Sequence, residues 1–277
     1  MFSDCGSIEG GNGIYAIAPG EGPPLLVACD MSSSPGGWTI VQRRIDGSQE
    51  FNRKWKEYAV GFGVPSGEFW LGNEALHRLT AENCSSLKID FTDIYGKKWV
   101  AEYEEFYISD ADDGYRIHVS GYSGNASDAL EYQNKMQFSA VDSDRDISNT
   151  HCAQNYEGGW WFSHCQHANL NGRYNLGLTW FDGTRNEWIA VAFSEMKERL
   201  ARRIQQVKVT PIIHFIIDQI FVERDFHINL VREASTLFWK KPSLQGVRLT
   251  EFERLQPQQI NADDEEFTKD PKNVGKS

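Results

Sequence analysis

The sequence lacks any uninterrupted apolar run of the ~20 residues that a membrane-spanning helix requires. Its most hydrophobic segment, PIIHFIIDQIFV from Pro211, is interrupted by His214 and Asp218. The N-terminal MFSDCGSIEGG has neither the basic start nor the apolar stretch of a secretory signal, so the leader of a secreted protein would be absent from this sequence. We therefore expect a globular protein without membrane insertion.

An excess of positive charge is also missing. Residues 1–199 contain 16 Lys and Arg against 28 Asp and Glu, whereas residues 200–277 contain 12 against 11. An acidic surface repels phosphate backbones and attracts divalent cations. Nucleic-acid binding is thus not expected, and partners should be neutral or cationic. Heptads and Gly-X-Y repeats are missing too, so any homo-oligomer would have to form through the domain itself.

The region after residue 200 has no cysteine and only two of the 24 glycines. This change of composition predicts a domain at 1–199 and a separate tail at 200–277, partly helical and then disordered at DDEEFTKDPKNVGKS. Five cysteines precede the boundary, and two bridges with one spare thiol are the simplest count. A sequon at Asn125 gives a second hint of the secretory route, and Asn83 begins another.

Short β-like runs alternate with glycine-rich turns throughout residues 1–199, without the strand-helix alternation of a parallel sheet. The pattern predicts an α+β fold dominated by antiparallel strands. Strands are expected at LLVAC, WTIVQRR, SLKIDF and YRIHVSG, and short helices at 53–58 and 73–79.

Three aspartates, Asp142, Asp144 and Asp146, stand at alternate positions in DSDRD. Such spacing can converge oxygens on Ca²⁺, which takes six to eight of them. An EF-hand is excluded, because its glycine position holds Ile147 and its glutamate position holds Ala153. A solvated acidic turn is the alternative reading of this segment.

Several longer motifs occur in one order along the chain: CDMSSSPGGWTIVQRRIDGSQEFNRKW, then DSDRD, NTHCAQNYEGGWWFSHC, NLNGRY and SEMKER. Together they resemble the fibrinogen C-terminal domain, as found in ficolins, tachylectins, angiopoietins, tenascins and fibrinogen. The resemblance covers about Cys5 to Arg199. It implies a small N-terminal part closed by a Cys5–Cys29 disulfide, a central antiparallel sheet with short flanking helices, and a loop-rich calcium and ligand subdomain with a Cys152–Cys165 disulfide.

The same resemblance implies a calcium ligand set. The family's ligands fall on the side chains of Asp144 and Asp146 and on the backbone carbonyls of Ser148 and Thr150. Asp142 would be a supporting carboxylate. So few charged ligands imply the weak affinity that is usual for calcium in extracellular modules.

Ficolin-like and tachylectin-like members grip the acetyl group of sugars beside the calcium. The resemblance implies that Tyr156 forms one aromatic wall and that the His164–Cys165 peptide is cis and directs backbone N–H groups at the ligand. Gln166 is also expected among the ligand-binding residues, although a histidine is usual in the family at this position.

A second departure follows Tyr174, where the chain is shorter by roughly eight residues than is usual in the family, and two pocket residues are thereby missing. Trp188 would be the final aromatic wall of the pocket. We therefore expect an extracellular, calcium-dependent lectin of innate immune recognition that binds N-acetylated glycans. The alternative is a protein-binding adhesion or signalling module that has lost the acetyl pocket.

Enzyme chemistry is not expected. Cys84 in ENCSSLKIDF is typical of a small buried thiol at the entry to a strand rather than of a nucleophile. A zinc site at His151-Cys152, His164-Cys165 and His167 competes with the calcium and disulfide interpretation, but its spacing matches no common zinc knuckle.

Overall fold

A computed structural model describes residues 2–81, 85–175 and 177–200. Of the tail expected at 200–277, residues 201–277 lie outside this description, as do the Cys84 thiol and the Asn83 sequon. The elements are, in chain order, η1 (Cys5–Ser7), β1 (Gly13–Ile17), β2 (Leu25–Asp30), β3 (Trp38–Arg44), α1 (Trp55–Val60), β4 (Phe62–Gly63), β5 (Phe69–Trp70), α2 (Asn73–Thr80), β6 (Ser85–Asp93), β7 (Lys98–Ile108), β8 (Ile117–Gly124), η2 (Glu131–Gln133), α3 (Cys152–Asn155), β9 (Ala168–Asn169), β10 (Thr179–Asp182) and β11 (Glu187–Leu200).

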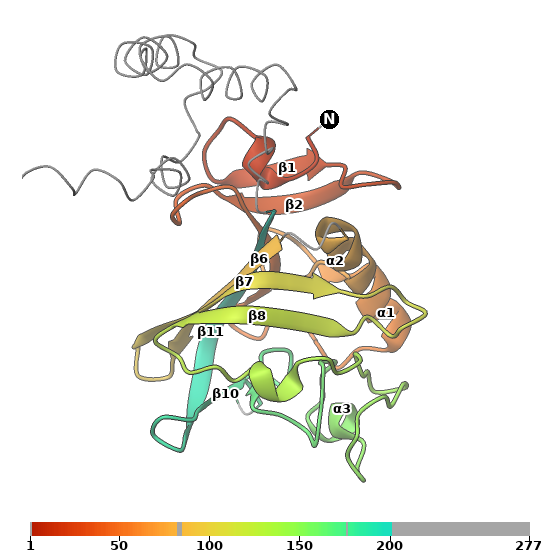
Figure 1. The fold of residues 1–277 in the computed structure, drawn as a ribbon, viewed down its shortest axis with the longest axis vertical. Coiled ribbons are helices and arrows are strands. Elements are labelled where there is room, and N and C mark those ends of the chain that lie inside the picture. Colours follow the sequence, from red (N-terminus) through yellow and green to blue (C-terminus); the bar gives the residue numbers. More distant parts are fainter. Residues whose placement is uncertain (1, 82–84, 176, 201–277) are drawn as a thin grey trace, which may run out of the picture. The chain divides into compact units, whose positions relative to one another are not determined.

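One antiparallel sheet with the strand order β1-β2-β3-β11-β6-β7-β8 forms the centre of the domain (Figure 1). The last strand, β11, lies in the middle of this order, between β3 and β6. Burial alternates residue by residue along β6, as the period of two in a strand requires. The expected α+β fold with an antiparallel sheet is confirmed.

Helices α1 and α2 lie beside the sheet and coincide with the expected helical segments (Figure 1). Below them, the loop-rich end contains α3, β9 and β10. Because few ladders hold this end, buried aromatics and side-chain hydrogen bonds replace them. Trp160 and Trp161 are fully buried, and the Trp161 indole donates to the Tyr115 carbonyl oxygen at 2.7 Å. The Asn171 amide donates to the Gly159 carbonyl oxygen at 3.0 Å.

Two disulfides join the pairs that the resemblance implies. Cys5 and Cys29 connect η1 to β2, and Cys152 and Cys165 close the loop that begins with α3. No helix among the described residues is long and apolar enough to cross a membrane.

Candidate functional site

The acidic loop before α3 brings three metal-ligating side chains together. Ligand atoms of Asp144, Asp146 and His151 all lie within 4.8 Å of one another. Sequence analysis placed the two aspartates in the site but considered His151 only for zinc. His151 directly precedes Cys152, so the disulfide-anchored start of α3 positions it.

Among these three side chains, Asp146 is fixed by two hydrogen bonds from backbone amides. Its Oδ1 accepts from the Ser148 amide and its Oδ2 from the Cys152 amide, both at 2.9 Å. Burial and the neighbouring Asp144 carboxylate raise the pKa of Asp146, against the lowering effect of those two amides. Two carboxylates held this close repel each other, and a divalent cation between them would remove the repulsion.

The donor set fits a hard cation. Beside the two carboxylates, the hydroxyl groups of Ser148 and Thr150 lie 3.3 Å apart, so oxygen atoms prevail in this loop. Calcium prefers such oxygen donors. A zinc site that uses cysteine is excluded, because Cys152 and Cys165 are joined to each other and supply no thiolate.

Asp142 has a structural contact that the sequence did not predict. Its Oδ1 accepts from the backbone N–H of Trp55 at 2.7 Å, at the first residue of α1. The N-terminal N–H groups of a helix lack partners within the helix, so a carboxylate at this position satisfies one of them. Asp142 therefore connects the acidic loop to α1, and it is not one of the three converging residues.

The resemblance implied a cis peptide at His164–Cys165, but this peptide is trans. Among the described residues, Ser34–Pro35 is the cis peptide. The turn forms instead through a positive φ of 61° at Cys165 and a hydrogen bond of 2.9 Å from the Ser163 amide to the Cys165 carbonyl oxygen.

The residues expected to surround an acetyl group each contact different parts of the domain. The ring of Tyr156 is half-buried and stacks with Phe162 at 6.0 Å between centroids. The side chain of Gln166 is buried, and its amide donates to the Thr179 hydroxyl at 3.1 Å. Trp188 is 52% exposed and contacts other rings. His164 is exposed, in the turn directly before Cys165.

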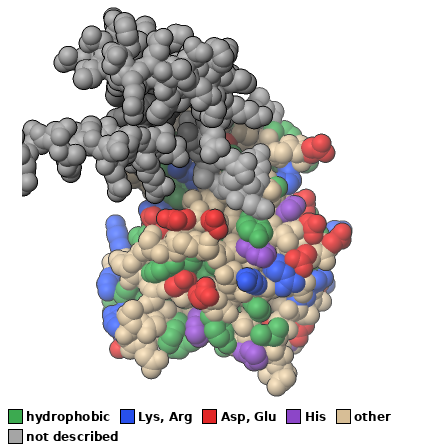
Figure 2. Space-filling model, viewed as in Figure 1, with side chains coloured by type: hydrophobic (Ala, Val, Ile, Leu, Met, Phe, Trp, Pro, Cys, Tyr) green, Lys and Arg blue, Asp and Glu red, His purple; other side chains and the backbone are tan. Residues whose placement is uncertain are grey.

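Trp188 belongs to a surface group that we call the aromatic cluster: Tyr132, His167, Phe181 and Trp188. Tyr132 stacks on His167 at 3.8 Å, and Phe181 lies 4.8 Å from His167 and 5.2 Å from Trp188. Burial lowers the pKa of His167, which favours its neutral, stacking form. Figure 2 shows histidine and hydrophobic side chains together on the lower part of the viewed face, over the loop-rich end.

The sequence did not identify Tyr132 and Phe181 as site residues, and it suggested His167 only as a zinc ligand. Tyr132 comes from η2, His167 from the segment before β9, and Phe181 from β10, so no local spacing links them. The hydroxyl of Tyr132 also donates to the His164 carbonyl oxygen at 3.4 Å, which joins the aromatic cluster to the Cys165 turn. Pairing of β10 with β11 places Phe181 opposite Trp188.

Tyr174, which precedes the short segment, contacts the edge of the sheet. The Tyr174 hydroxyl lies within hydrogen-bonding distance of the carbonyl oxygens of Ile45 and Ala192. Tyr174 thus closes the loop onto β11 and the residues after β3, where a longer chain would be expected in the resembling family.

A model of the family described as "Fibrinogen beta and gamma chains, C-terminal globular domain" matches residues 4–201. The chain belongs to this fibrinogen C-terminal family. Protein scabrous of Drosophila melanogaster is 64% identical over 198 residues, which are 71% of this chain and 24% of scabrous. Tenascin of Gallus gallus is 41% identical over 181 residues, 64% of this chain and 10% of tenascin. Ryncolin-4 of Cerberus rynchops is 39% identical over 197 residues, 68% of this chain and 57% of ryncolin-4.

Solved structures agree with the family. The fibrinogen-like globe domain of human ANGPTL2 superposes with a TM-score of 0.66 at 33% identity, covering 72% of this chain and 99% of that domain. A lamprey fibrin D-dimer, complexed with the peptide ligand Gly-His-Arg-Pro-amide, gives 0.65 at 30% identity and covers 74% and 78%. The expected fold family is confirmed.

Members of this fibrinogen C-terminal family are generally binding modules rather than enzymes. The chain spans less than two thirds of the length of each of these three relatives, scabrous, tenascin and ryncolin-4.

Proposed function

We propose that this fibrinogen C-terminal domain is an extracellular recognition module that binds a polypeptide partner through the aromatic cluster. The observation that carries the proposal is the exposed Trp188 ring, which contacts Phe181 and continues through His167 to Tyr132, three partly buried side chains. Tryptophan and tyrosine side chains are over-represented among the residues that dominate binding energy in protein interfaces. The peptide complex of the lamprey relative supports a polypeptide ligand.

The burial of Gln166 also favours this function over acetyl-group binding. A pocket for an acetyl group needs a polar donor beside the aromatic wall. In this chain the Gln166 amide donates to Thr179 instead, and Trp188 contacts Phe181 rather than Tyr156. The acidic character of residues 1–199 favours a neutral or cationic partner.

Trp188→Ala should weaken peptide binding by about 30-fold, since a central aromatic residue contributes about 2 kcal/mol. Peptides selected from a displayed library against the full chain provide the probe, with affinity measured by calorimetry. Tyr95→Ala is the matched control, because Tyr95 is 89% exposed on the turn between β6 and β7. Equal losses in both variants would contradict a specific role for the aromatic cluster.

Acetylated resin tests the competing glycan function on the same protein. Retention that both a chelator and free acetate reverse would establish an acetyl-binding lectin beside the calcium loop and would overturn the polypeptide proposal. Flow-through of folded protein that still binds the selected peptides is the expected result.

We also propose calcium as the cofactor, held by the side chains of Asp144 and Asp146 with the carbonyls of Ser148 and Thr150. The convergence of the two carboxylates supports this assignment. In this position the ion would tie the acidic loop to the Cys152–Cys165 disulfide and, through Asp142, to α1. The ion would supply charge neutralisation that fixes the acidic loop.

Asp144→Asn should remove about half of the thermal stabilisation that calcium gives. Wild-type protein at about 100 times the Kd of calcium would gain about 2.7 kcal/mol, whereas a tenfold weaker site would gain roughly half of that. Within the described part of the chain, the Asp144 side chain accepts one hydrogen bond, a long one of 3.4 Å from the Asp146 amide, so the fold should survive. Melting curves with calcium and with chelator measure the effect. Asp112→Asn, which changes an exposed acid on another loop, should respond to calcium as the wild type does.

An extracellular location is part of the same proposal. The two disulfides persist in oxidising compartments and are rare in the cytosol. Asn125 is exposed at the end of β8, so its side chain is accessible for an N-linked glycan.

A further inference from the structure

His151 brings a nitrogen ligand into the acidic loop, beside the oxygen ligands proposed for calcium. A ring nitrogen of His151 and carboxylate oxygens of Asp144 and Asp146 all lie within 4.8 Å of one another. Calcium takes oxygen ligands, whereas imidazole suits zinc and neighbouring transition metals. The histidine therefore adds a donor that calcium does not use.

The imidazole is available to an ion. His151 is the N-cap of α3, and within the described residues its ring accepts one hydrogen bond, from the Gln154 amide to Nδ1 at 3.4 Å. A hydrogen bond of this length is weak. The ring can therefore turn a nitrogen toward a metal ion at little cost.

Asp146 and His151 are linked through Cys152. The Cys152 amide donates to Asp146 Oδ2 at 2.9 Å, and Cys152 directly follows His151 and is bonded to Cys165. Each carboxylate oxygen has two acceptor sites, so Asp146 can bind an ion and keep its bonds from backbone amides. Two of the three ligands are thus positioned before an ion arrives, and the exposed Asp144 can move toward them.

The negative charge of the two aspartates is not neutralised by the arginine that stands between them in sequence. The guanidinium of Arg145 lies over the Trp55 ring, 4.4 Å from its centroid, and Nε donates to the Ser143 hydroxyl at 3.2 Å. Because this cation is directed at other partners, a bound dication would supply the positive charge that the carboxylates lack.

Zinc fits the number and kind of these ligands. Catalytic-type zinc sites combine three protein ligands, such as histidine and carboxylate, at about 2.0 to 2.2 Å with a water in the fourth position. Such ligands lie about 3.4 Å apart around a tetrahedral ion, so side-chain movements of about 1 Å would close the group. Rotation of the exposed Asp144 side chain can supply most of this movement. No cysteine is needed, and both cysteines of this region are in a disulfide.

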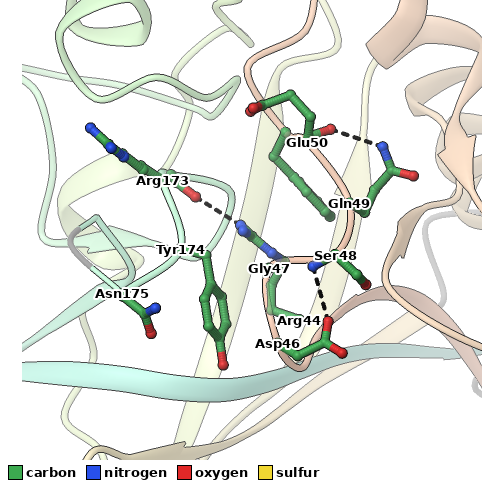
Figure 3. A pocket seen from close by; sticks show the side chains of 11 residues that line it. Arg44, Asp46, Gly47, Ser48, Gln49, Glu50, Arg173, Tyr174 and Asn175 are labelled. Atoms are coloured by element: carbon green, nitrogen blue, oxygen red, sulfur yellow. Dashed lines mark hydrogen bonds between the residues drawn. The ribbon is translucent and has the colours of Figure 1, made fainter.

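A polar hollow beside Tyr174 offers no equivalent site (Figure 3). Its lining includes the carboxylates of Asp46 and Glu50, but also the guanidinium groups of Arg44 and Arg173, which repel a dication. No histidine or cysteine is among its described lining residues. The acidic loop is therefore the better place for a zinc-class ion.

We infer that a zinc-class divalent cation binds Asp144, Asp146 and His151 in competition with calcium. The inference rests on the proposed calcium site, because both ions use the two carboxylates. His151 is the ligand that selects zinc, whereas the carbonyls of Ser148 and Thr150 serve calcium. The acidic loop thereby responds to the ratio of the two ions.

Calorimetric titrations of the full chain, with its disulfides intact and its metals removed by a chelator, test the inference. Zinc and calcium are titrated separately, and zinc is then titrated in the presence of saturating calcium. We expect both ions to bind and the apparent Kd of zinc to rise with the calcium concentration. In NMR spectra of the same samples, zinc should shift the ring C–H signals of His151 more than calcium does.

Two substitutions separate the ligands of the two ions. His151→Asn should weaken zinc binding by roughly 10- to 100-fold and leave calcium binding within about twofold of the wild type. Asparagine is a good N-cap residue, so α3 should survive this change. Asp144→Asn should weaken the binding of both ions. His164→Asn is the matched control, because His164 is exposed and directly precedes Cys165, and it should affect neither ion.

Melting curves in chelator show whether the variants fold as the wild type does. Calcium binding without zinc binding, or zinc binding that His151→Asn leaves unchanged, would overturn the inference and leave the calcium proposal intact. Zinc binding that saturating calcium does not weaken would also overturn it, since the two ions would then occupy separate sites. Failure of both ions to bind would overturn the calcium proposal as well.

Discussion

Replacing Glu68 by alanine should lower the free energy of unfolding by about 3 to 5 kcal/mol, the range for breaking a buried charge pair. Glu68 is 3% exposed, and its two oxygens accept four N–H groups of the 45–49 segment. Alanine would leave these amides without partners and Arg44 without its neighbouring charge.

The pKa of Glu68 is consistent with this role. Burial alone would raise that pKa, but the hydrogen bonds from the 45–49 amides and the charge of Arg44 hold it below its usual value. The ionised form is therefore the one that the fold requires.

Urea denaturation measures the loss, with Glu68→Gln and Glu102→Ala as comparisons. Glutamine keeps the shape and one acceptor oxygen, so an intermediate loss is expected. Glu102 forms a partly exposed ion pair with Lys88, and its removal should cost less than about 1 kcal/mol. A loss for Glu68→Ala as small as that of Glu102→Ala would show that the 45–49 segment does not depend on the carboxylate.

Replacing Glu198 by glutamine should make the stability of the domain less dependent on pH. Glu198 is fully buried in β11, where its Oε1 accepts from the Ser85 hydroxyl at 2.8 Å. Its Oε2 has no hydrogen-bond partner among the described residues. Burial raises the pKa of Glu198 from 4.5 to about 8.

The sign of the effect follows from proton binding. Between pH 4.5 and pH 8 the folded domain keeps the proton on Glu198 and the unfolded chain releases it. Stability from this group is therefore complete below about pH 4.5 and is lost as the pH rises toward 8. The loss is on the order of a few kcal/mol, since each pKa unit corresponds to about 1.4 kcal/mol.

Urea midpoints measured from pH 5 to pH 9 test this prediction. Glu198→Gln should match the wild type near pH 5 and exceed it at pH 8 to 9, whereas Glu102→Gln should follow the wild type throughout. A difference between Glu198→Gln and the wild type that stays constant over this range would exclude an ionisation of Glu198.

Local patterns predicted four strands and two short helices, which correspond to β2, β3, β6, β8, α1 and α2, whereas the long strands β7 and β11 were not predicted. The alternating burial of β6 is visible in SLKIDF, and the helices at 55–60 and 73–80 follow from short segments between turns. The family motifs predicted the two disulfides in the same way, since cysteines are few and their positions in NTHCAQNYEGGWWFSHC are distinctive.

Long-range contacts could not be predicted. Asp142 was expected to support a metal ion, but it also caps α1 through Trp55, 87 residues away. The cis peptide expected at His164–Cys165 was wrong, because a positive φ at Cys165 forms the turn. Gln166 was a candidate ligand residue, yet it turns inward to Thr179.

The sequence by itself determined the family, the antiparallel sheet, the disulfide pairs and the acidic loop, because each depends on residues that are close in the chain or on motifs of fixed spacing. Only the tertiary structure decided which side chains share a surface. The aromatic cluster combines segments from different parts of the chain. Its geometry follows from strand pairing and from the packing of loops, which no local pattern encodes.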